Sequence, residues 1–351
     1  MTYEPLSRKE LISVIEGKAQ ARRVPIFAHM WVHPEEFGDR RPAVDQILNR
    51  YPEDVRWLWV RMPEIYSAPP DDPDYRWVNW DNPNKNGAAA LDEQIALAHW
   101  PQLDDMLEHF PNPHYPAMTD FARNHPDDGR YRLAQLWFCF YERHWMLRGM
   151  TNALLDYYTN PDEVHRLYRA LTDFYLVAME RARKEMRADG FMVSDDLGTQ
   201  TGPFFSPAVF HEFFKPYYKE LIEKSHALGM HFWLHCCGNI TALLPDFIEI
   251  GLDVIHPIQK FAMDQAATAR KFGGQITFWA GLDVQNVIPW GKPEEVRGEV
   301  RHLIDSFWRP REGRLILTFG NGVNGDCTLE SLSAFLQEAY GYGSEKIRNK
   351  Q

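Results

Sequence analysis

The sequence predicts a single (β/α)8 barrel, for three reasons. Eight strand-like runs are spread along the chain, and each is followed by a helical pattern or by an irregular excursion. A length of 351 residues is common for one such barrel. Polar side chains gather where the later runs end, which is where barrels place their reactive groups. A doubly wound parallel sheet is the alternative, because it shares this alternation of strands and helices.

The first third of the chain holds two strand-like runs and a long irregular excursion. Ser7 and Glu10 have the spacing of a capping box, which predicts a helix at the start. Short apolar runs rich in strand formers follow at 24–32 and 57–62. Residues 66–129 contain nine prolines, and we expect an irregular insertion or lid there after the second strand. Within it we expect short helices at 91–100 and 103–110.

Regular alternation resumes after the excursion. Helical patterns separate the later strand-like runs, and several of these helices begin next to a Pro or end at a Gly. Strands that alternate with helices pair in parallel, so these runs complete one domain that spans 1–351. The six runs are 133–140, 191–196, 230–237, 253–259, 276–283 and 314–320.

The composition excludes several classes of protein. With 38 Lys+Arg against 49 Asp+Glu, the net charge of −11 argues against a nucleic-acid binder, which needs cations to neutralise phosphates. No run reaches the roughly 18 apolar residues that a membrane helix needs. The charged N-terminus does not resemble a signal peptide. Four cysteines, two of them adjacent, are not a disulfide framework, so we expect a cytoplasmic protein with reduced thiols.

Polar residues end five consecutive predicted strands. In a parallel barrel these ends meet at one rim, so we expect the side chains to form one site. Asp and His are candidate acids and bases there, and Gln and Asn are candidate hydrogen-bonding walls. The residues, in chain order, are Asp195, Asp196, Gln200, His235, Cys237, His256, Gln259, Asp283, Gln285 and Asn321.

His235 and Cys237 are two residues apart on a strand and therefore project from the same face. An imidazole beside a thiol is half of a zinc site, although a His-x-Cys pair can also be purely structural. A third ligand is required, and Cys327 follows the last strand. Carboxylates at the rim are alternatives, from Asp195, Asp196 or Asp283. Zinc at such a site would hold a substrate thiol as a nucleophilic thiolate; without zinc, paired carboxylates could hold a protonated or pyrrolic substrate.

Other strand ends supply possible substrate contacts. His29 and Trp31 end the first run and either line the pocket or form an aromatic rim. Tyr141 and Arg143 follow the third run, where Arg143 either clamps a carboxylate or pairs with an acid of its helix.

The chain is rich in aromatic residues, with 12 Trp, 15 Tyr and 21 Phe. Such an excess indicates either an aromatic core or a flat ligand. Trp233 and Trp279 lie on predicted strands and are expected to fill the barrel. Five other tryptophans are candidates to line the mouth: Trp31, Trp77, Trp80, Trp100 and Trp145.

The stretches 195–259, 278–296 and 338–343, together with 141–150, resemble the uroporphyrinogen decarboxylase superfamily. The HCCGN and GLDVIHPIQ motifs carry most of this resemblance, which implies a (β/α)8 barrel. True decarboxylases of the superfamily have an arginine-rich segment after the first strand, where this chain reads HMWVHPEEFGDRRP. Arg40 and Arg41 lie nearby, but the motif itself is absent. The chain therefore looks closer to the corrinoid-dependent methyltransferase branch.

That branch implies zinc held by His-x-Cys and a later Cys, and a cobalamin on a partner protein. His235 and Cys237 match the first two ligands, whereas Asn321 stands where the later Cys is expected. The resemblance therefore implies a methyltransferase that takes a methyl group from a small donor and passes it to a corrinoid protein. The aromatic excess would suit a methoxylated aromatic compound as this donor. Asp196 or His256 would protonate the leaving oxygen. The alternatives are a cofactor-free decarboxylase or lyase, and a non-catalytic tetrapyrrole or corrinoid binder.

Overall fold

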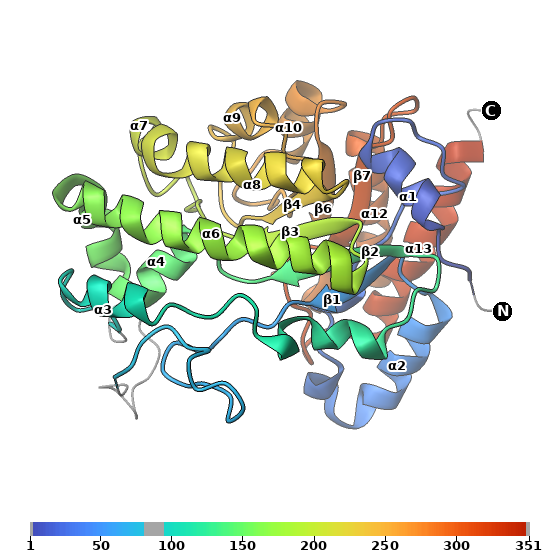
Figure 1. Cartoon of the computed structure of the whole chain (residues 1–351). Coiled ribbons are helices and arrows are strands. Elements are labelled where there is room, and N and C mark those ends of the chain that lie inside the picture. The colour runs from blue at the N-terminus through green and yellow to red at the C-terminus, as the bar shows by residue number, and fades with distance from the viewer. Residues whose placement is uncertain (1–2, 81–94, 349–351) are drawn as a thin grey trace.

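The computed structural model describes residues 3–80 and 95–348. It has one curled sheet of seven parallel strands whose order in space follows their order in the chain. This order excludes the doubly wound sheet, and the architecture is that of a TIM-barrel-like α/β fold (Figure 1). The strands are β1 (Val55–Trp59), β2 (Tyr131–Leu136), β3 (Gly190–Ser194), β4 (His231–His235), β5 (Val254–His256), β6 (Thr277–Leu282) and β7 (Leu315–Phe319).

Helices surround the strands and cover the outer face of the curled sheet (Figure 1). The capping box at Ser7 and Glu10 is formed, as the sequence predicted. The α-helices are α1 (Arg8–Ile15), α2 (Arg41–Arg50), α3 (Gln102–Glu108), α4 (Tyr141–Arg148), α5 (Met150–Thr159), α6 (Pro161–Met186), α7 (Pro207–Val209), α8 (Lys215–Ala227), α9 (Leu244–Glu249), α10 (Gln265–Phe272), α11 (Val287–Trp290), α12 (Pro293–Phe307) and α13 (Leu329–Arg348). Short 3-10 and π segments are η1 (His29–Trp31), η2 (Pro34–Arg40), η3 (Pro116–Asn124) and η4 (Phe210–Phe214).

Residues 24–32 do not form the continuous strand that the sequence predicted. Ile26 makes a single parallel bridge with Leu317 of β7, and the chain then turns into η1. Pro25 has no N–H to donate, and the Ile26 N–H donates to the Asp54 carboxylate (2.7 Å) instead of to a neighbouring strand. The segment nevertheless closes the gap between β7 and β1, because Phe27 N donates to Leu317 O (3.0 Å) and Asp54 N donates to Ile26 O (2.9 Å).

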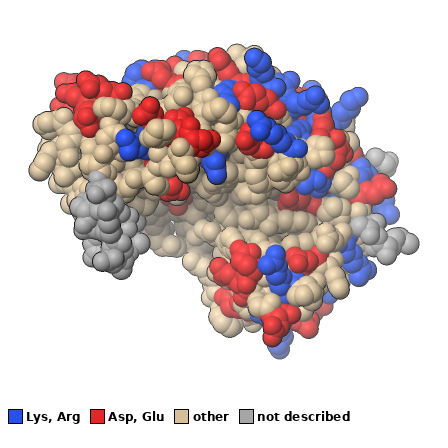
Figure 2. Space-filling view, turned by 60° about the horizontal axis from the view of Figure 1, so that its bottom comes forward, with Lys and Arg blue, Asp and Glu red and all other residues tan. Residues whose placement is uncertain are grey.

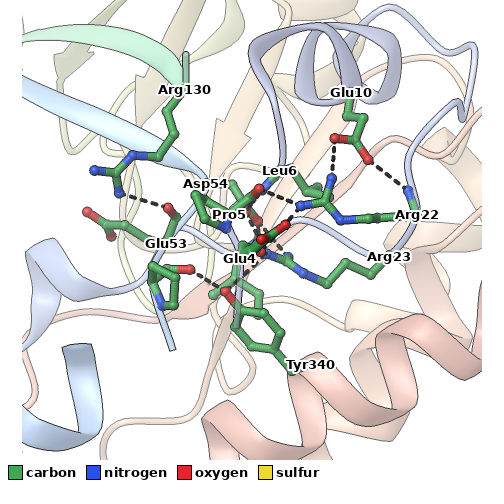
Figure 3. A network of polar contacts seen from close by, with 12 residues as sticks. Glu4, Pro5, Leu6, Glu10, Arg22, Arg23, Glu53, Asp54, Arg130 and Tyr340 are labelled. Carbon is green, nitrogen blue, oxygen red and sulfur yellow. Dashed lines mark hydrogen bonds and ion pairs between the residues drawn. The ribbon is translucent and has the colours of Figure 1, made fainter. Parts of the chain in front are cut away.

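A buried ion pair fixes this closure (Figure 3). Arg23 donates to both oxygens of Asp54, each at 2.7 Å, and Leu6 N donates to the same carboxylate at 2.6 Å. Tyr340 of α13 accepts from Arg23 (3.1 Å) and so ties the last helix to the same group. The Asp54 carboxylate is inaccessible to water, and its charge is compensated by one cation and two backbone N–H groups.

Part of the aromatic excess fills the barrel. Trp233 of β4 and Trp279 of β6 are fully buried, as expected. Phe27 of the closing segment stacks on Trp279 with ring centroids 4.7 Å apart. The interior is therefore a packed aromatic core and not a channel.

Between β1 and β2 the described residues contain α3 and η3. The helix expected at 103–110 is confirmed as α3. At 91–100, residues 95–100 are not helical, and 91–94 lie outside the described residues, as do 81–90 of the expected insertion. The role of 66–129 as a lid stays a prediction.

Charged side chains on the face shown in Figure 2 are of both signs and interspersed, without a continuous basic band. Within the described part of the chain, no helix has the length and apolar content to cross a membrane.

Candidate active site

The carboxyl ends of β3 and β4 bring three potential metal ligands together. The ligand atoms of Asp196, His235 and Cys237 all lie within 4.8 Å of one another. His235 Nε2 lies 3.4 Å from Cys237 Sγ and 3.5 Å from Asp196 Oδ1. The same Oδ1 atom of Asp196 also accepts a hydrogen bond from Cys237 N (2.7 Å). This bond holds the loop after β4 against the loop after β3.

The spacing of these atoms suits a tetrahedral zinc ion. Zn–S, Zn–N and Zn–O bonds of about 2.3, 2.05 and 2.1 Å at tetrahedral angles place S and N about 3.6 Å apart and N and O about 3.4 Å apart. The distances of 3.4 Å from N to S and 3.5 Å from N to O lie within 0.2 Å of these values. Side-chain movement on binding would therefore be small.

A hydrogen-bonded chain under the group fixes the tautomer of His235. His256 Nε2 lies 3.0 Å from the carbonyl oxygen of Phe319, so this nitrogen carries the proton and donates. In a neutral His256 the other nitrogen, Nδ1, then accepts from His235 Nδ1, which is 2.7 Å away. His235 Nε2 is left with a free lone pair that faces Cys237 and Asp196, the form that a metal requires.

Burial keeps both imidazoles neutral. It lowers the pKa of His235, against a smaller opposing effect of Asp196, and lowers the pKa of His256 well below its ordinary value. Burial also raises the pKa of the Cys237 thiol, and the nearby charges of Asp196 and Glu142 raise it further. A positive ion would reverse this effect, because it stabilises the thiolate.

A cavity of about 550 Å³ opens beside the three-residue group, and we call it the donor cavity. Four tryptophans, Trp31, Trp57, Trp59 and Trp137, supply most of its flat surface. Trp31 also stacks on His256, with ring centroids 4.8 Å apart, and Asn321 lines the wall nearest Cys237. The remaining lining residues are His29, Met30, Val32, His33, Glu35, Glu53 and Gln135.

Several polar atoms of the donor cavity are buried and have no hydrogen-bond partner: Trp31 Nε1, Gln135 Nε2 and His29 Nε2. The amide of Gln135 is oriented, because its Oε1 accepts from the indole N–H of Trp57. Its –NH₂ group is therefore the end left for a ligand. Buried donors without partners are costly, so they indicate that a ligand with acceptor oxygens completes them.

A family model described as uroporphyrinogen decarboxylase (URO-D) matches residues 145–342. The chain belongs to the uroporphyrinogen decarboxylase family. The match begins within α4 and ends in α13, so it includes β3 to β7 and the residues 196, 235 and 237.

Known members of the family, and one solved structure, are similar to this chain. A methylated-thiol–coenzyme M methyltransferase from Methanosarcina mazei is 25% identical over 194 residues, which are 54% of this chain and 48% of that protein. A uroporphyrinogen decarboxylase from Xanthomonas oryzae is 27% identical over 185 residues, 50% of this chain and 49% of that protein. The chain thus spans about half the length of the curated relatives it matches. The structure of a methyltransferase from Methanosarcina mazei has the same fold, with a TM-score of 0.62 at 12% identity over 97% of this chain and 99% of that one.

Two of the acids that the sequence placed at the rim cap helices instead of facing the cavity. Asp195 accepts from the backbone N–H groups of residues 140–142 at the start of α4, at 2.8–3.2 Å, and from the Tyr218 hydroxyl at 2.6 Å. Burial raises the pKa of Asp195 to about 6 despite these donors. Asp283 accepts from the N–H groups of residues 285–287 ahead of α11. Both acids therefore orient backbone.

The three glutamines that were expected to form a hydrogen-bonding wall do not form one surface. Gln259 accepts from Gly238 N (3.0 Å) and holds the loop that carries Cys237. Gln200 donates to Phe261 O (2.6 Å), and Gln285 is exposed. None of these three glutamines is among the described residues that line the donor cavity, whereas His29, Trp31 and Asn321 are.

Asn321 and Cys327 occupy different places relative to the group. Asn321 Nδ2 lies 3.7 Å from Cys237 Sγ, and its carbonyl oxygen is taken by Gly322 N (2.8 Å). It therefore offers the sulfur an N–H and not a metal lone pair. Cys327 is buried, with its thiol against the Thr328 carbonyl (3.3 Å), and Asp196, not Cys327, is the third residue of the group.

Of the five tryptophans that were candidates for the mouth, Trp31 is the one among the described lining residues of the donor cavity. Trp77 is fully buried, and Trp80 and Trp100 donate their indole N–H groups to Ala96 O and Asp156. Trp77, Trp80, Trp100 and Trp145, which were candidates by their position along the chain, are not among the described residues that line this cavity. Trp57, Trp59 and Trp137 take their place, since alternate residues of β1 and the end of β2 face inward.

Two acids with raised pKa values were missed by the sequence reasoning. Glu53 lines the donor cavity, accepts from His29 N (3.0 Å), and has its pKa raised to about 8 by burial. Glu142 accepts from the Ser194 hydroxyl (2.6 Å), and burial together with Asp196 and Asp195 raises its pKa well above the ordinary value. Glu53 precedes a predicted strand and does not follow one, whereas Glu142 follows the run 133–140 and could have been found by its position. Tyr141 is buried beside Phe204 and Phe205, with its hydroxyl lacking a partner.

Proposed function

We propose that this protein is a methyltransferase that demethylates a methoxylated aromatic compound and passes the methyl group to a corrinoid on a partner protein. The observation that carries the proposal is the group of Asp196, His235 and Cys237, whose atoms have the spacing of zinc ligands. The group lies behind two lining residues of an aromatic cavity, since Asn321 Nδ2 is 3.7 Å from Cys237 Sγ and the centroid of the Trp31 ring is 5.2 Å from that of the His235 ring. Membership of the family and the likeness to methyltransferases support it.

His235 Nε2, Cys237 Sγ and one oxygen of Asp196 would hold the zinc ion. When bound, zinc supplies Lewis acidity to the ether oxygen of the donor. Asn321 assists in a different way, because its N–H group donates toward Cys237 Sγ and favours the thiolate. The carboxylate of Asp196 takes the place of the later cysteine that the methyltransferase branch uses.

Cleavage of an aryl methyl ether requires a proton for the leaving oxygen. The oxygen keeps the electron pair of the broken C–O bond. Of the two glutamates that line the cavity, Glu35 and Glu53, Glu53 is the one whose pKa is raised, to about 8, so that it can donate a proton at neutral pH. His256 is less suited, because it is fully buried and both of its ring nitrogens are already bonded. It acts as a positioning residue for His235.

The donor cavity suits an aromatic ring that carries oxygen substituents. The tryptophans offer stacking surfaces, and the free N–H groups of Gln135 and Trp31 donate to ligand oxygens. The cavity contains no Lys or Arg among its described lining residues. A porphyrinogen with many carboxylates needs several cations, so the decarboxylase alternative has less support.

Zinc content tests the proposal. We expect about one zinc per chain in the purified protein, loss of zinc in Cys237→Ala and Asp196→Ala, and retention in Cys327→Ala, which is the matched control for the other candidate ligand. A folded wild-type protein that binds no added zinc would refute the metal site. A second assay then distinguishes an enzyme from a non-catalytic corrinoid binder. It measures, by the change in absorbance, the methylation of added cob(I)alamin by methoxylated aromatic donors.

A further inference from the structure

A second cavity, of about 390 Å³, adjoins the donor cavity. Trp59 and Trp137 line both, so the two cavities meet at these side chains. Its other walls come from residues 62–67, after β1, and from Phe138, Arg143 and Met146, after β2. The volume is within the range of small-molecule sites.

The guanidinium of Arg143 is a buried cation in this wall. Only 3% of the residue is exposed, and its Nε has no hydrogen-bond partner. Among the described residues no carboxylate oxygen lies within the 4.0 Å of an ion pair with it. Its flat face lies over the Trp77 ring, 4.4 Å from the centroid, and 5.5 Å from that of Phe138. Stacking uses the face of the guanidinium and leaves N–H groups at its edge.

Two other buried arginines are compensated by an acid, and a third, Arg132, donates to the backbone carbonyls of Met186 (2.9 Å) and His125 (3.0 Å). Arg23 donates to both oxygens of Asp54, each at 2.7 Å. Arg148 donates to both oxygens of Asp156, at 2.8 and 3.0 Å. A buried cation without a carboxylate is costly, and Arg143 differs from these two in lining a cavity. The difference suggests that its counterion comes with a ligand.

The charged and polar groups near Arg143 do not replace such a counterion. Glu142 is bound by the Ser194 hydroxyl (2.6 Å). The Tyr175 hydroxyl donates to the carbonyls of Phe138 and Cys139, and its oxygen is a hydrogen-bond partner of the Arg143 guanidinium, but a neutral hydroxyl supplies no countercharge. Glu64 lies on the cavity wall and is exposed to water. Tyr66, on the same wall, has a buried hydroxyl without a partner.

We propose that this second cavity is an anion subsite, which binds the carboxylate of an aromatic methyl donor. The Arg143 guanidinium receives the carboxylate at its free edge, and the Tyr66 hydroxyl donates to it. The aromatic ring then extends between Trp59 and Trp137 into the donor cavity, with the methoxy group toward Cys237. The proposal rests on the proposed function and narrows its substrate to methoxylated aromatic carboxylates.

Binding to the full-length wild-type protein tests the subsite without any methyl transfer. We expect calorimetry to give a dissociation constant for 4-methoxybenzoate at least about tenfold lower than for 4-methoxybenzamide, which has the same shape but no charge. Added salt should weaken this preference only slightly, because salt screens a buried ion pair poorly. Equal affinities, or no binding of either compound, would overturn the proposal.

Variants assign the preference to Arg143. We expect Arg143→Met to abolish the preference for the carboxylate, Arg143→Lys to retain part of it, and Glu64→Gln to leave it unchanged. If Glu64 is the internal counterion, Glu64→Gln instead tightens benzoate binding, and the proposal fails. The wild-type comparison of the two compounds decides the question even if Arg143→Met does not fold.

The subsite and the proposed function can fail separately. Methyl transfer from methoxybenzene, which has no carboxylate, tests the chemistry alone. Transfer from methoxybenzene that equals transfer from 4-methoxybenzoate in kcat/KM sinks the subsite and leaves the methyltransferase intact. Tight binding of 4-methoxybenzoate without transfer sinks the methyltransferase and leaves the subsite.

Discussion

The closure of the barrel depends on one carboxylate, and we predict that Asp54→Asn strongly destabilises the protein. The carboxylate accepts four hydrogen bonds of 2.6–2.7 Å, two from Arg23 and one each from Leu6 N and Ile26 N. The amide keeps the shape but removes the charge, and its –NH₂ group faces donors. Breaking a buried ion pair costs about 3–5 kcal/mol. We therefore expect the free energy of unfolding to fall by about 4 kcal/mol, from a total that is typically about 5–15 kcal/mol.

Urea titration followed by tryptophan fluorescence measures this loss. Asp173→Asn is the matched control, because Asp173 forms an ion pair with Arg169 at 2.8 Å but is 66% exposed. Exposed pairs contribute little, so the control should lose less than about 1 kcal/mol. A loss below about 1 kcal/mol in Asp54→Asn would show that the ion pair does not hold the closing segment, and the account of the closure would be wrong.

Three further predictions concern the site. His256→Phe removes the acceptor that fixes the His235 tautomer, so zinc affinity measured by chelator competition should fall about 10–100-fold. The surface variant His226→Gln should leave the affinity unchanged, and equal affinities of His256→Phe and the wild type would contradict the tautomer argument. Asn321→Cys places a thiol beside Cys237 and should tighten zinc binding at least about tenfold in the same assay; unchanged or weaker binding argues against a fourth-ligand position there. Burial lowers the pKa of His29 to about 4, so the unfolded chain binds a proton near pH 6.5 that the folded chain excludes, and stability falls as the pH drops from 7 to 5. His29 contributes about 1–2 kcal/mol to that fall, so urea titrations should find a smaller difference in the free energy of unfolding between pH 7 and pH 5 in His29→Gln than in the wild type. The same difference in both proteins would mean that His29 is not excluded from water.

Much of the fold was predictable because the barrel repeats one local pattern. Each of the strands from β2 to β7 overlaps a run of strand-forming residues in the sequence, and helices with Pro or Gly at their ends separate these strands. The first run failed as a strand because its partners are not local. Pro25 lacks a donor, and the N–H of Ile26 is bound by Asp54, a side chain 28 residues away. No local sequence pattern shows that this N–H group donates to a distant carboxylate instead of to a neighbouring strand.

The candidate site was predictable where it depends on strand periodicity. His235 and Cys237 share a face because they are two residues apart, and Asp196 reaches them because β3 and β4 are neighbours, with Ser194 paired to His235. The third candidate ligand could not be chosen in advance among Cys327, Asp195, Asp196 and Asp283, because tertiary contacts set the path of the loops that carry them. Gln135 illustrates the same limit, since the orientation of its unpartnered –NH₂ group depends on the Trp57 indole that donates to its oxygen.

The closure and the metal group are linked through β7. Asp54 holds Ile26, and the segment around Ile26 bonds Leu317 on both sides, with Phe27 N to Leu317 O at 3.0 Å and Leu317 N to Pro25 O at 2.8 Å. Two residues later, Phe319 O fixes His256 (3.0 Å), and His256 fixes the lone pair of His235. A loosened closure should therefore weaken zinc binding as well as the fold, and zinc, which binds only the closed form, should restore stability to Asp54→Asn. If folded Asp54→Asn instead binds zinc with wild-type affinity, the closing segment supports the barrel but does not position the His235–His256 pair.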